Sequence, residues 1–309
     1  MNSAKPWLAI WQFHVPIQKT MHVPNALTVD VEDYFHVAAF SSNISRDSWD
    51  TIESRVEKNT KTLLTIFEQF DVRCTFFVLG CVAERNPQLV KDIARMGHEI
   101  ACHGYSHRLV YEQSPEDFFK ETQHAKELLE NITGSAIVGY RAASYSIVQE
   151  SLWALDILVD LGFLYDSSIF PVHHDRYGIP NAERTPHRML TPTGKSIVEW
   201  PLSTAKVFGF RLPVAGGGYF RLLPYWVSQW GLESINRREQ KPFIFYLHPW
   251  EIDPAQPRVA ASRLSRFRHY TNLDQCELRL RRLLAKFQFG TAKDSLVLMR
   301  LINETGASQ

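Results

Sequence analysis

Two histidines stand four residues apart in His103-Gly-Tyr-Ser-His107, directly after a short apolar run that ends at Cys102. If the chain turns helically after His103, side chains at this spacing share one face, with Cβ atoms about 5–6 Å apart. Two imidazole nitrogens placed in this way can bind one divalent ion such as zinc. The same spacing also arises by chance, so a metal site is indicated only if other suitable residues reach the same place.

Other reactive side chains follow predicted strands in the same way. Asp30, Arg141, Asp166 and His248 each stand directly after a short apolar run, as His103 does. In α/β barrels, the loops that follow the strands build the active-site face. We therefore expect these side chains to gather at one end of the sheet. Five reactive side chains directly after five predicted strands would be unlikely if they were only solvated loop residues.

Residues of these types can together hydrolyse an amide or an ester. Two neutral histidines and one carboxylate leave an open metal position, as in catalytic zinc sites. A metal there lowers the pKa of a bound water toward about 7. A second carboxylate can act as general base, a further histidine can protonate the leaving group, and an arginine beside the base keeps it ionised.

Alternating strands and helices must position these residues. Such alternation is typical of a parallel sheet, either open or closed into a barrel. The apolar patterns predict strands over 26–29, 74–79, 98–102, 136–140, 163–165, 196–200, 242–247 and 295–299, and helices over 56–70, 87–96, 114–131, 151–161, 224–236 and 273–287.

The composition limits the class of protein and its partners. The 309 residues carry a formal net charge of +1 at pH 7, so no long-range field favours nucleic acid. The four cysteines form no CxxC pair, which indicates buried free thiols. The first 24 residues lack the apolar core of a signal peptide, and no stretch resembles a membrane span. These features predict a cytoplasmic protein.

From about Ala26 to Trp250, the chain resembles the polysaccharide deacetylases of the NodB-homology type, carbohydrate esterase family 4. The resemblance implies an α/β fold with a distorted (β/α) barrel, and removal of acetyl groups from a saccharide with a divalent metal, usually zinc. Five stretches carry it in the family's order: Thr28-Val-Asp-Val-Glu-Asp33, His103-Gly-Tyr-Ser-His107, Gly139-Tyr-Arg-Ala-Ala-Ser-Tyr145, Tyr165-Asp-Ser-Ser168 and Phe245-Tyr-Leu-His-Pro249.

The resemblance also implies a role for each matching residue. Arg141 pairs with the base, and His248 is the acid. The remaining implied roles are Asp30 as base, His103 and His107 as metal ligands, Leu247 in the acetyl pocket, and Tyr145 and Trp250 as substrate-binding residues. The third motif lacks its usual proline after Arg141, and the fourth lacks its usual tryptophan. Trp200 or Trp250 could wall the sugar site in its place, although each fits the core equally well.

The third metal ligand is either Glu32 or Asp33. The usual first motif has adjacent aspartates, whereas here the acids are spread as Asp30-Val-Glu32-Asp33. If the strand continues past Asp30, Glu32 shares a face with it, which favours Glu32 as the ligand. If the chain turns after Asp30, Asp33 could reach the metal instead.

Shorter stretches resemble a narrower branch, the deacetylases encoded with exopolysaccharide and exosortase (PEP-CTERM) gene clusters. They are 29–35, 216–220, 248–253 and 266–272. This resemblance implies a deacetylase barrel over 25–254 and a family-specific C-terminal region over 255–309 packed on the barrel. It implies an exopolysaccharide or its lipid-linked precursor as substrate and allows peripheral contact with the inner membrane, while the oligomeric state stays open. Residues 1–24 stand before the first strong strand and are expected to form an N-terminal extension.

Two alternatives remain. The first is a hydrolase of the same fold that acts on small cyclic amides or allantoin-like compounds in a closed pocket. The second is a non-catalytic carbohydrate-binding barrel, in which at least one of the residues Asp30, His103, His107 and His248 would lie away from the others.

Overall fold

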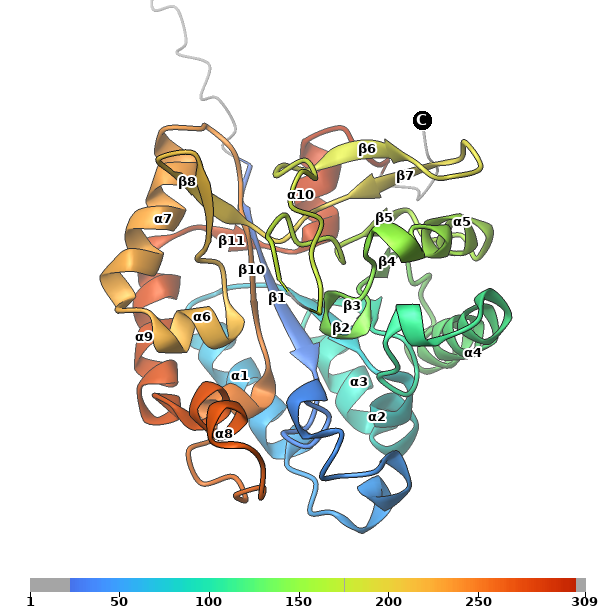
Figure 1. Cartoon of the computed structure of the whole chain (residues 1–309), viewed down its shortest axis with the longest axis vertical. Helices are drawn as coiled ribbons and strands as arrows, with labels where there is room; N and C mark the ends of the chain where they lie inside the picture. Colours follow the sequence, from blue (N-terminus) through green and yellow to red (C-terminus); the bar gives the residue numbers. More distant parts are fainter. Residues whose placement is uncertain (1–22, 175, 304–309) are drawn as a thin grey trace, which may run out of the picture.

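A curled half-barrel sheet forms the centre of the computed structural model, which describes residues 23–174 and 176–303 (Figure 1). All described pairings within this sheet are parallel except the one between its last two strands. Its strands, in spatial order, are β10 (Ile244–Leu247), β1 (Asn25–Val31), β2 (Thr75–Val78), β3 (Glu99–Cys102), β4 (Gly139–Tyr140), β5 (Tyr165–Asp166), β7 (Ser196–Glu199) and β6 (His187–Leu190), and β11 (Phe289–Gly290) also pairs with β1. The predicted distorted (β/α) barrel is confirmed.

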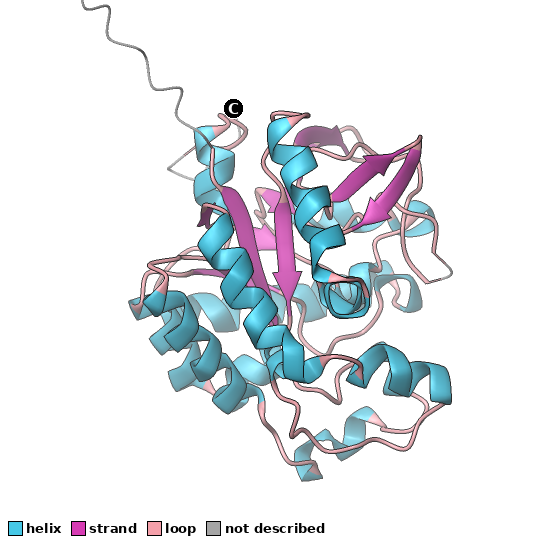
Figure 2. Ribbon diagram, turned by 90° about the vertical axis from the view of Figure 1, so that its left-hand side faces the viewer, coloured by secondary structure: helices cyan, strands magenta, loops and turns pink. Residues whose placement is uncertain are grey.

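Helices surround the sheet (Figures 1 and 2). They are α1 (Val56–Gln69), α2 (Gly80–Arg85), α3 (Pro87–Arg95), α4 (Pro115–Thr133), α5 (Trp153–Asp160), α6 (Gly217–Leu222), α7 (Tyr225–Arg237), α8 (Arg263–Tyr270), α9 (Leu273–Lys286) and α10 (Ala292–Leu298). A separate hairpin joins β8 (Thr204–Val207) to β9 (Phe210–Pro213). None of the described helices is long and apolar enough to cross a membrane.

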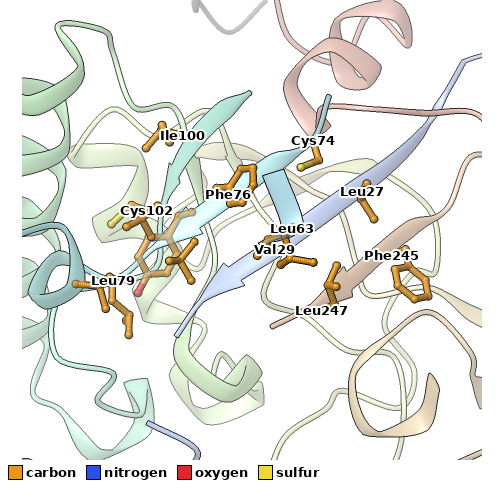
Figure 3. Close-up of a cluster of buried hydrophobic side chains, with 14 of the residues drawn as sticks. Leu27, Val29, Leu63, Cys74, Phe76, Leu79, Ile100, Cys102, Phe245 and Leu247 are labelled. Atoms are coloured by element: carbon orange, nitrogen blue, oxygen red, sulfur yellow. The ribbon is translucent and has the colours of Figure 1, made fainter. Parts of the chain in front are cut away.

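Strand β1 lies between the hydrophobic core and the inner face of the curled sheet. All seven of its residues are buried, as expected for a parallel strand covered on both faces. Leu27 and Val29 point into the core beside Leu63 of α1, as Figure 3 shows. Because successive side chains alternate, Thr28 and Asp30 point to the opposite face, inside the curl of the sheet, where both contact Arg141.

The predicted strand over 295–299 is wrong, because this segment belongs to helix α10. The Thr291 hydroxyl caps the helix by accepting a hydrogen bond from the Asp294 backbone N–H. Ser295 and Leu296 are buried, so the apolar run fills one side of a helix rather than both faces of a strand. The strand near the end of the chain that pairs with β1 is instead β11, which was not predicted from the sequence.

The loop after His103 is not helical. Gly104 has φ of +74° and His107 has φ of +53°, so the chain turns irregularly and brings the second histidine back toward the first. The four cysteines are free and buried, as predicted. The predicted extension over residues 1–24 lies almost wholly outside the described residues, and the division at residue 254 stays a prediction.

Candidate active site

Glu32 and the two motif histidines converge at the end of β1 and β3. Oε1 of Glu32 lies 2.9 Å from Nε2 of His103 and 3.0 Å from Nε2 of His107. The three potential ligand atoms lie within 4.8 Å of one another, and all three residues are buried. Glu32 directly follows β1, and His103 directly follows β3, so two parallel strand ends deliver the first two members of the cluster.

The donor set of this cluster fits a divalent cation. Nδ1 of His103 lies 2.7 Å from the backbone carbonyl of Arg141. A carbonyl only accepts hydrogen bonds, so Nδ1 carries a hydrogen. Nε2, which lies on the side of Glu32, is then the ring atom that can bind a cation, and a backbone carbonyl bonded to the other ring nitrogen is the usual arrangement at metal-binding histidines.

Glu32 carries the negative charge that such a cation requires. Burial acts to raise the pKa of Glu32, but the charge of His107 and the hydrogen bonds from both histidines outweigh it and hold that pKa well below its ordinary value. The carboxyl group is therefore ionised at neutral pH. Two imidazoles and this carboxylate can hold a metal ion with an open position, as in catalytic zinc sites.

Asp33, the other candidate for the third ligand, points away from the histidines. Its carboxylate accepts a hydrogen bond of 2.6 Å from the Ser54 hydroxyl and others from the backbone N–H groups of Arg55 and Val56. These groups lie at the start of α1, so Asp33 caps that helix and fixes the turn after Glu32. Of the two candidates, the structure brings only Glu32 to the cluster.

Asp30 lies beside the cluster in a fixed orientation. Its Oδ1 accepts a hydrogen bond of 2.7 Å from Nη1 of Arg141. The Tyr145 hydroxyl lies 3.4 Å from Oδ2, and Nε2 of His248 lies 3.9 Å from the same oxygen. Asp30 is 1% exposed and Arg141 is fully buried, so this charge pair is shielded from water.

Arg141 is held in place on several sides. Nε donates to the backbone carbonyl of Ser167 over 3.1 Å, and Nη1 also donates to the Thr28 hydroxyl over 2.8 Å. The guanidinium lies 4.1 Å from the centre of the Phe77 ring. These hydrogen bonds and the Phe77 ring fix the plane of the Arg141 guanidinium. The Asp30 carboxylate that binds it therefore has a single favoured position.

His248 is held by a carboxylate that the sequence did not point to. Nδ1 of His248 lies 2.8 Å from Oε1 of Glu251, which also accepts a hydrogen bond from the His248 backbone N–H. Burial acts to lower the pKa of His248, but the hydrogen bond and charge of Glu251 and the charge of Glu32 raise it to about 9. His248 is therefore charged at neutral pH and can donate a proton.

Glu251 is in turn paired with Arg221 of α6, whose Nε donates to Oε2 over 2.7 Å. Burial acts to raise the pKa of Glu251, but the charge of Arg221 and the hydrogen bond with His248 lower it to about 2. One signal for Glu251 was available, because His248-Pro249-Trp250-Glu251 has the spacing of a capping box with proline at the first helical position. Arg221 lies 30 residues from Glu251 and has no such local signal.

Two glycines allow Arg221 to reach the site. A Cβ atom at Gly216 would clash with the backbone carbonyl of Tyr246 in β10, and Gly216 has φ of +134°. A Cβ atom at Gly217 would meet the ring of Tyr246. Helix α6, which begins at Gly217, was not among the helices predicted from the sequence.

Asp166, one of the five strand-end residues, does not join the others around the cluster. It bonds instead with Glu199 and with the Ser168 hydroxyl, 2.5 Å from its Oδ1. Burial and the charge of Asp166 raise the pKa of Glu199 well above its ordinary value. The two carboxyls therefore share a proton in the core, because two adjacent buried charges would repel.

The residues predicted to bind substrate are mostly buried. Leu247 is 2% exposed, and Trp250 is 5% exposed and stacks against His248, with ring centres 5.1 Å apart. Trp200 is fully buried. Neither tryptophan therefore offers a free ring face to a sugar, so of the two roles left open for them the structure favours the core. Tyr145 is also buried and contacts Asp30.

The backbone N–H after Arg141 is already bonded, since Ala142 donates to the Ser168 hydroxyl over 2.7 Å. It is therefore not free to stabilise a developing oxyanion. Ser144 and Tyr145, just beyond it, both have positive φ, of +50° and +56°. Strained backbone of this kind often accompanies a functional site.

A cavity of about 680 Å³ borders the cluster at His107. Its volume lies in the range of small-molecule sites. The walls mix aromatic side chains with charged groups of both signs. They come from the loop after β1, the segment after His107 and the loop between β5 and β6: Phe35, His36, Val37, Ala38, Ser41, Ile44, Ser45, Arg46, Asp47, Trp49, His107, Leu109, Tyr111, Glu112 and Arg176.

Two family models match the chain, one after the other. Residues 46–163 match the model described as polysaccharide deacetylase, and residues 167–297 match a domain of unknown function, DUF3473. Over 98 residues the chain is 33% identical to the peptidoglycan-N-acetylglucosamine deacetylase of Bacillus cereus, a match that covers 31% of this chain and 36% of that protein. The chain spans about a third of the length of the curated relatives it matches.

Solved structures of similar fold agree with the observed architecture. One is described as a polysaccharide deacetylase from Mycobacterium smegmatis, with a TM-score of 0.56 and 21% identity over 90% of each chain. Another is the PuuE allantoinase, with a TM-score of 0.56 and 16% identity over 87% of each chain. At these identities the likeness concerns the fold alone, which enzymes with different substrates share.

Proposed function

From the premise that the chain carries a polysaccharide deacetylase domain followed by a DUF3473 region, we propose that the protein is a metal-dependent hydrolase that removes N-acetyl groups from a saccharide. The observation that carries the proposal is the cluster of Glu32, His103 and His107 beside the Asp30–Arg141 pair. The named activity of the Bacillus cereus relative, an N-acetylglucosamine deacetylase, supports this choice of reaction.

Glu32, His103 and His107 would hold the metal, with zinc as the expected ion. Bound there, a divalent metal supplies a Lewis acid for the acetyl carbonyl and lowers the pKa of a water molecule. The buried position of the three ligands excludes bulk water, which strengthens the electrostatic effect of the site on a developing negative charge.

Asp30 would act as the general base. It takes a proton from the attacking water as the new carbon–oxygen bond forms, and Arg141 holds its carboxylate toward the site. His248 would act as the general acid and donate its Nε2 proton to the sugar nitrogen as the carbon–nitrogen bond breaks. Acetate and a free amine are the products, and Glu251 keeps His248 charged before each cycle.

An exopolysaccharide or its lipid-linked precursor is the substrate we propose. Support comes from the resemblance of four short stretches to deacetylases encoded with exopolysaccharide gene clusters. We also propose that residues 25–254 form the deacetylase barrel, that residues 255–309 form a family-specific region packed on it, and that the enzyme works in the cytoplasm.

The test is acetate release from an acetylated chitooligosaccharide by the zinc-loaded protein, compared with the protein after chelation. Release that depends on metal and is lost in Asp30→Asn supports the proposal. Allantoin serves as the rival substrate, because the fold also resembles an allantoinase. Turnover of allantoin without acetate release would replace the proposal with a cyclic amide hydrolase, and turnover of neither substrate under any metal would favour a binding protein.

A further inference from the structure

Helix α8 exposes a surface that is both basic and apolar. Leu264 is 56% exposed and Phe267 is 59% exposed, and exposed arginines stand on either side of them. We define the α8 surface as Arg258, Arg263, Leu264, Arg266, Phe267 and Arg268. No aspartate or glutamate occurs from residue 254 to residue 273, so this surface is strongly positive even though the whole chain is nearly neutral.

The arginines of this surface frame a shallow cavity. Arg258, Arg263 and Arg266 line a hollow of about 380 Å³ together with Phe267 and Tyr270. The guanidinium of Arg258 lies 4.3 Å from the centre of the Tyr270 ring. In the described part of the chain, none of these three arginines forms an ion pair with an acidic side chain. Their charges are therefore available to an anionic partner.

Helix α8 also contacts the residues that surround the candidate acid. The ring of His269 stacks on Trp250, with centres 4.3 Å apart, and Trp250 stacks on His248. Nη1 of Arg221, the residue that pairs with Glu251, also donates to the backbone carbonyl of His269 over 2.8 Å. Figure 1 shows α8 near the end of the sheet toward which β1 points. A partner bound to α8 would lie next to the site.

We propose that the α8 surface docks the protein on an anionic lipid membrane. Lipid phosphates would bind Arg258, Arg263 and Arg266, while Leu264 and Phe267 enter the boundary between headgroups and acyl chains. Helices that lie in this boundary combine basic residues with exposed leucine and phenylalanine, and anionic lipid attracts each arginine near its surface. A soluble polyanion would satisfy the arginines but leave the two apolar side chains in water.

The docking inference does not depend on the proposed reaction, since docking is measured without turnover. The test is flotation of the full chain with vesicles of phosphatidylcholine alone or of equal parts phosphatidylcholine and phosphatidylglycerol. We expect binding only to the anionic vesicles and weaker binding at high salt. The double variant Arg263→Gln and Arg266→Gln should bind about 25-fold more weakly, at about fivefold for each arginine.

A matched control removes the same charge elsewhere. Arg237 and Arg238 are exposed at the end of α7, shortly before β10 begins and therefore at the other end of the strands. Arg237→Gln with Arg238→Gln should bind like the parent. Equal weakening in this control, or no binding to anionic vesicles, would overturn the proposal.

Phe267→Ser tests whether the apolar side chains take part in docking. The variant should lose vesicle binding while its circular dichroism spectrum stays that of the parent, because the side chain is exposed. Full retention of vesicle binding in Phe267→Ser, with loss in the double arginine variant, would show that the surface binds anionic groups by charge alone and would overturn docking by insertion of the apolar side chains.

Discussion

At the scale of single residues, two neighbouring acids that look alike in the sequence have different surroundings. Glu32 faces His103 and His107, whereas Asp33 caps α1. The cause is the turn after β1, in which the backbone N–H of Glu32 donates to the carbonyl of Asp30. No pattern of apolar residues encodes that turn, so the sequence left both acids as candidate ligands.

The first prediction separates these two acids. Glu32→Gln should lose the bound metal, because one ligand and its charge are removed. Asp33→Asn should keep the metal but lower the free energy of unfolding by about 1 kcal/mol, the usual cost of a weakened helix cap. Metal content by mass spectrometry and thermal unfolding of the two variants decide the point. Equal metal content in both variants would contradict the assignment of Glu32.

The second prediction concerns the base. Asp30→Asn should keep the metal, since Asp30 is not part of the cluster, and should slow acetate release by about 10²–10⁴-fold, the usual contribution of general acid–base catalysis. Steady-state rates and metal content are measured on the same sample. Near-normal turnover in this variant would remove Asp30 from the role of base.

The third prediction follows from the pKa of His248, which the structure raises to about 9 from 6.5. The protonated form that acts as acid therefore persists to about pH 9 and is lost as the pH rises through that value. In Glu251→Gln the hydrogen bond to a carboxylate and one of the raising charges are removed, while the charges of Glu32 and Asp30 remain, so the alkaline limb of kcat should move to lower pH.

The control for this experiment is Glu277→Gln, which loses an ion pair with Arg281 on α9 and has no contact with His248. Its pH profile should match that of the parent protein. If Glu251→Gln also kept the parent profile, Glu251 would be only a structural partner of His248.

At the scale of helices and strands, most of the framework was predictable because long apolar runs and caps are local signals. Helix α4 begins with Ser114, whose hydroxyl accepts from the Asp117 N–H, and ends before Gly134 with φ of +67°. Helix α10 was missed because its apolar run is short and its cap, Thr291, lies four residues before that run. The pairing of Arg221 with Glu251 depends on α6 meeting β10, a contact that no local pattern encodes.

The fourth prediction tests that contact. Gly216→Ala should lower the free energy of unfolding by about 1–3 kcal/mol for backbone strain, and more because the new methyl group meets the Tyr246 carbonyl. It should also reduce activity, since α6 carries Arg221. Gly194→Ala is the control, because Gly194 has φ of +86° but nothing lies within 4 Å of its Cβ position. Equal losses in both variants would show that strain alone matters.

At the scale of the whole molecule, the site crosses the boundaries of the two matched families. Asp30 and Glu32 precede the deacetylase match over 46–163, His103 and Arg141 lie within it, and His248 lies in the DUF3473 match over 167–297. The two matches therefore describe one folded unit, since β10 of the second region pairs with β1 upstream of the first.

The fifth prediction follows from this pairing. A chain that ends at residue 163 would leave β1 without its β10 neighbour and would lack His248, the proposed acid. We expect it to lack cooperative thermal unfolding, as measured by circular dichroism, and to retain no acetate release. A cooperative transition in this fragment would show that the deacetylase match folds independently.

Arg141 bonds to two parts of the candidate site, the Asp30 carboxylate and the metal-binding cluster. Its guanidinium orients Asp30, and its backbone carbonyl orients the ring of His103. The proposed base and one proposed metal ligand therefore take their orientation from a single residue. A substitution that displaces Arg141 would disturb both groups at once.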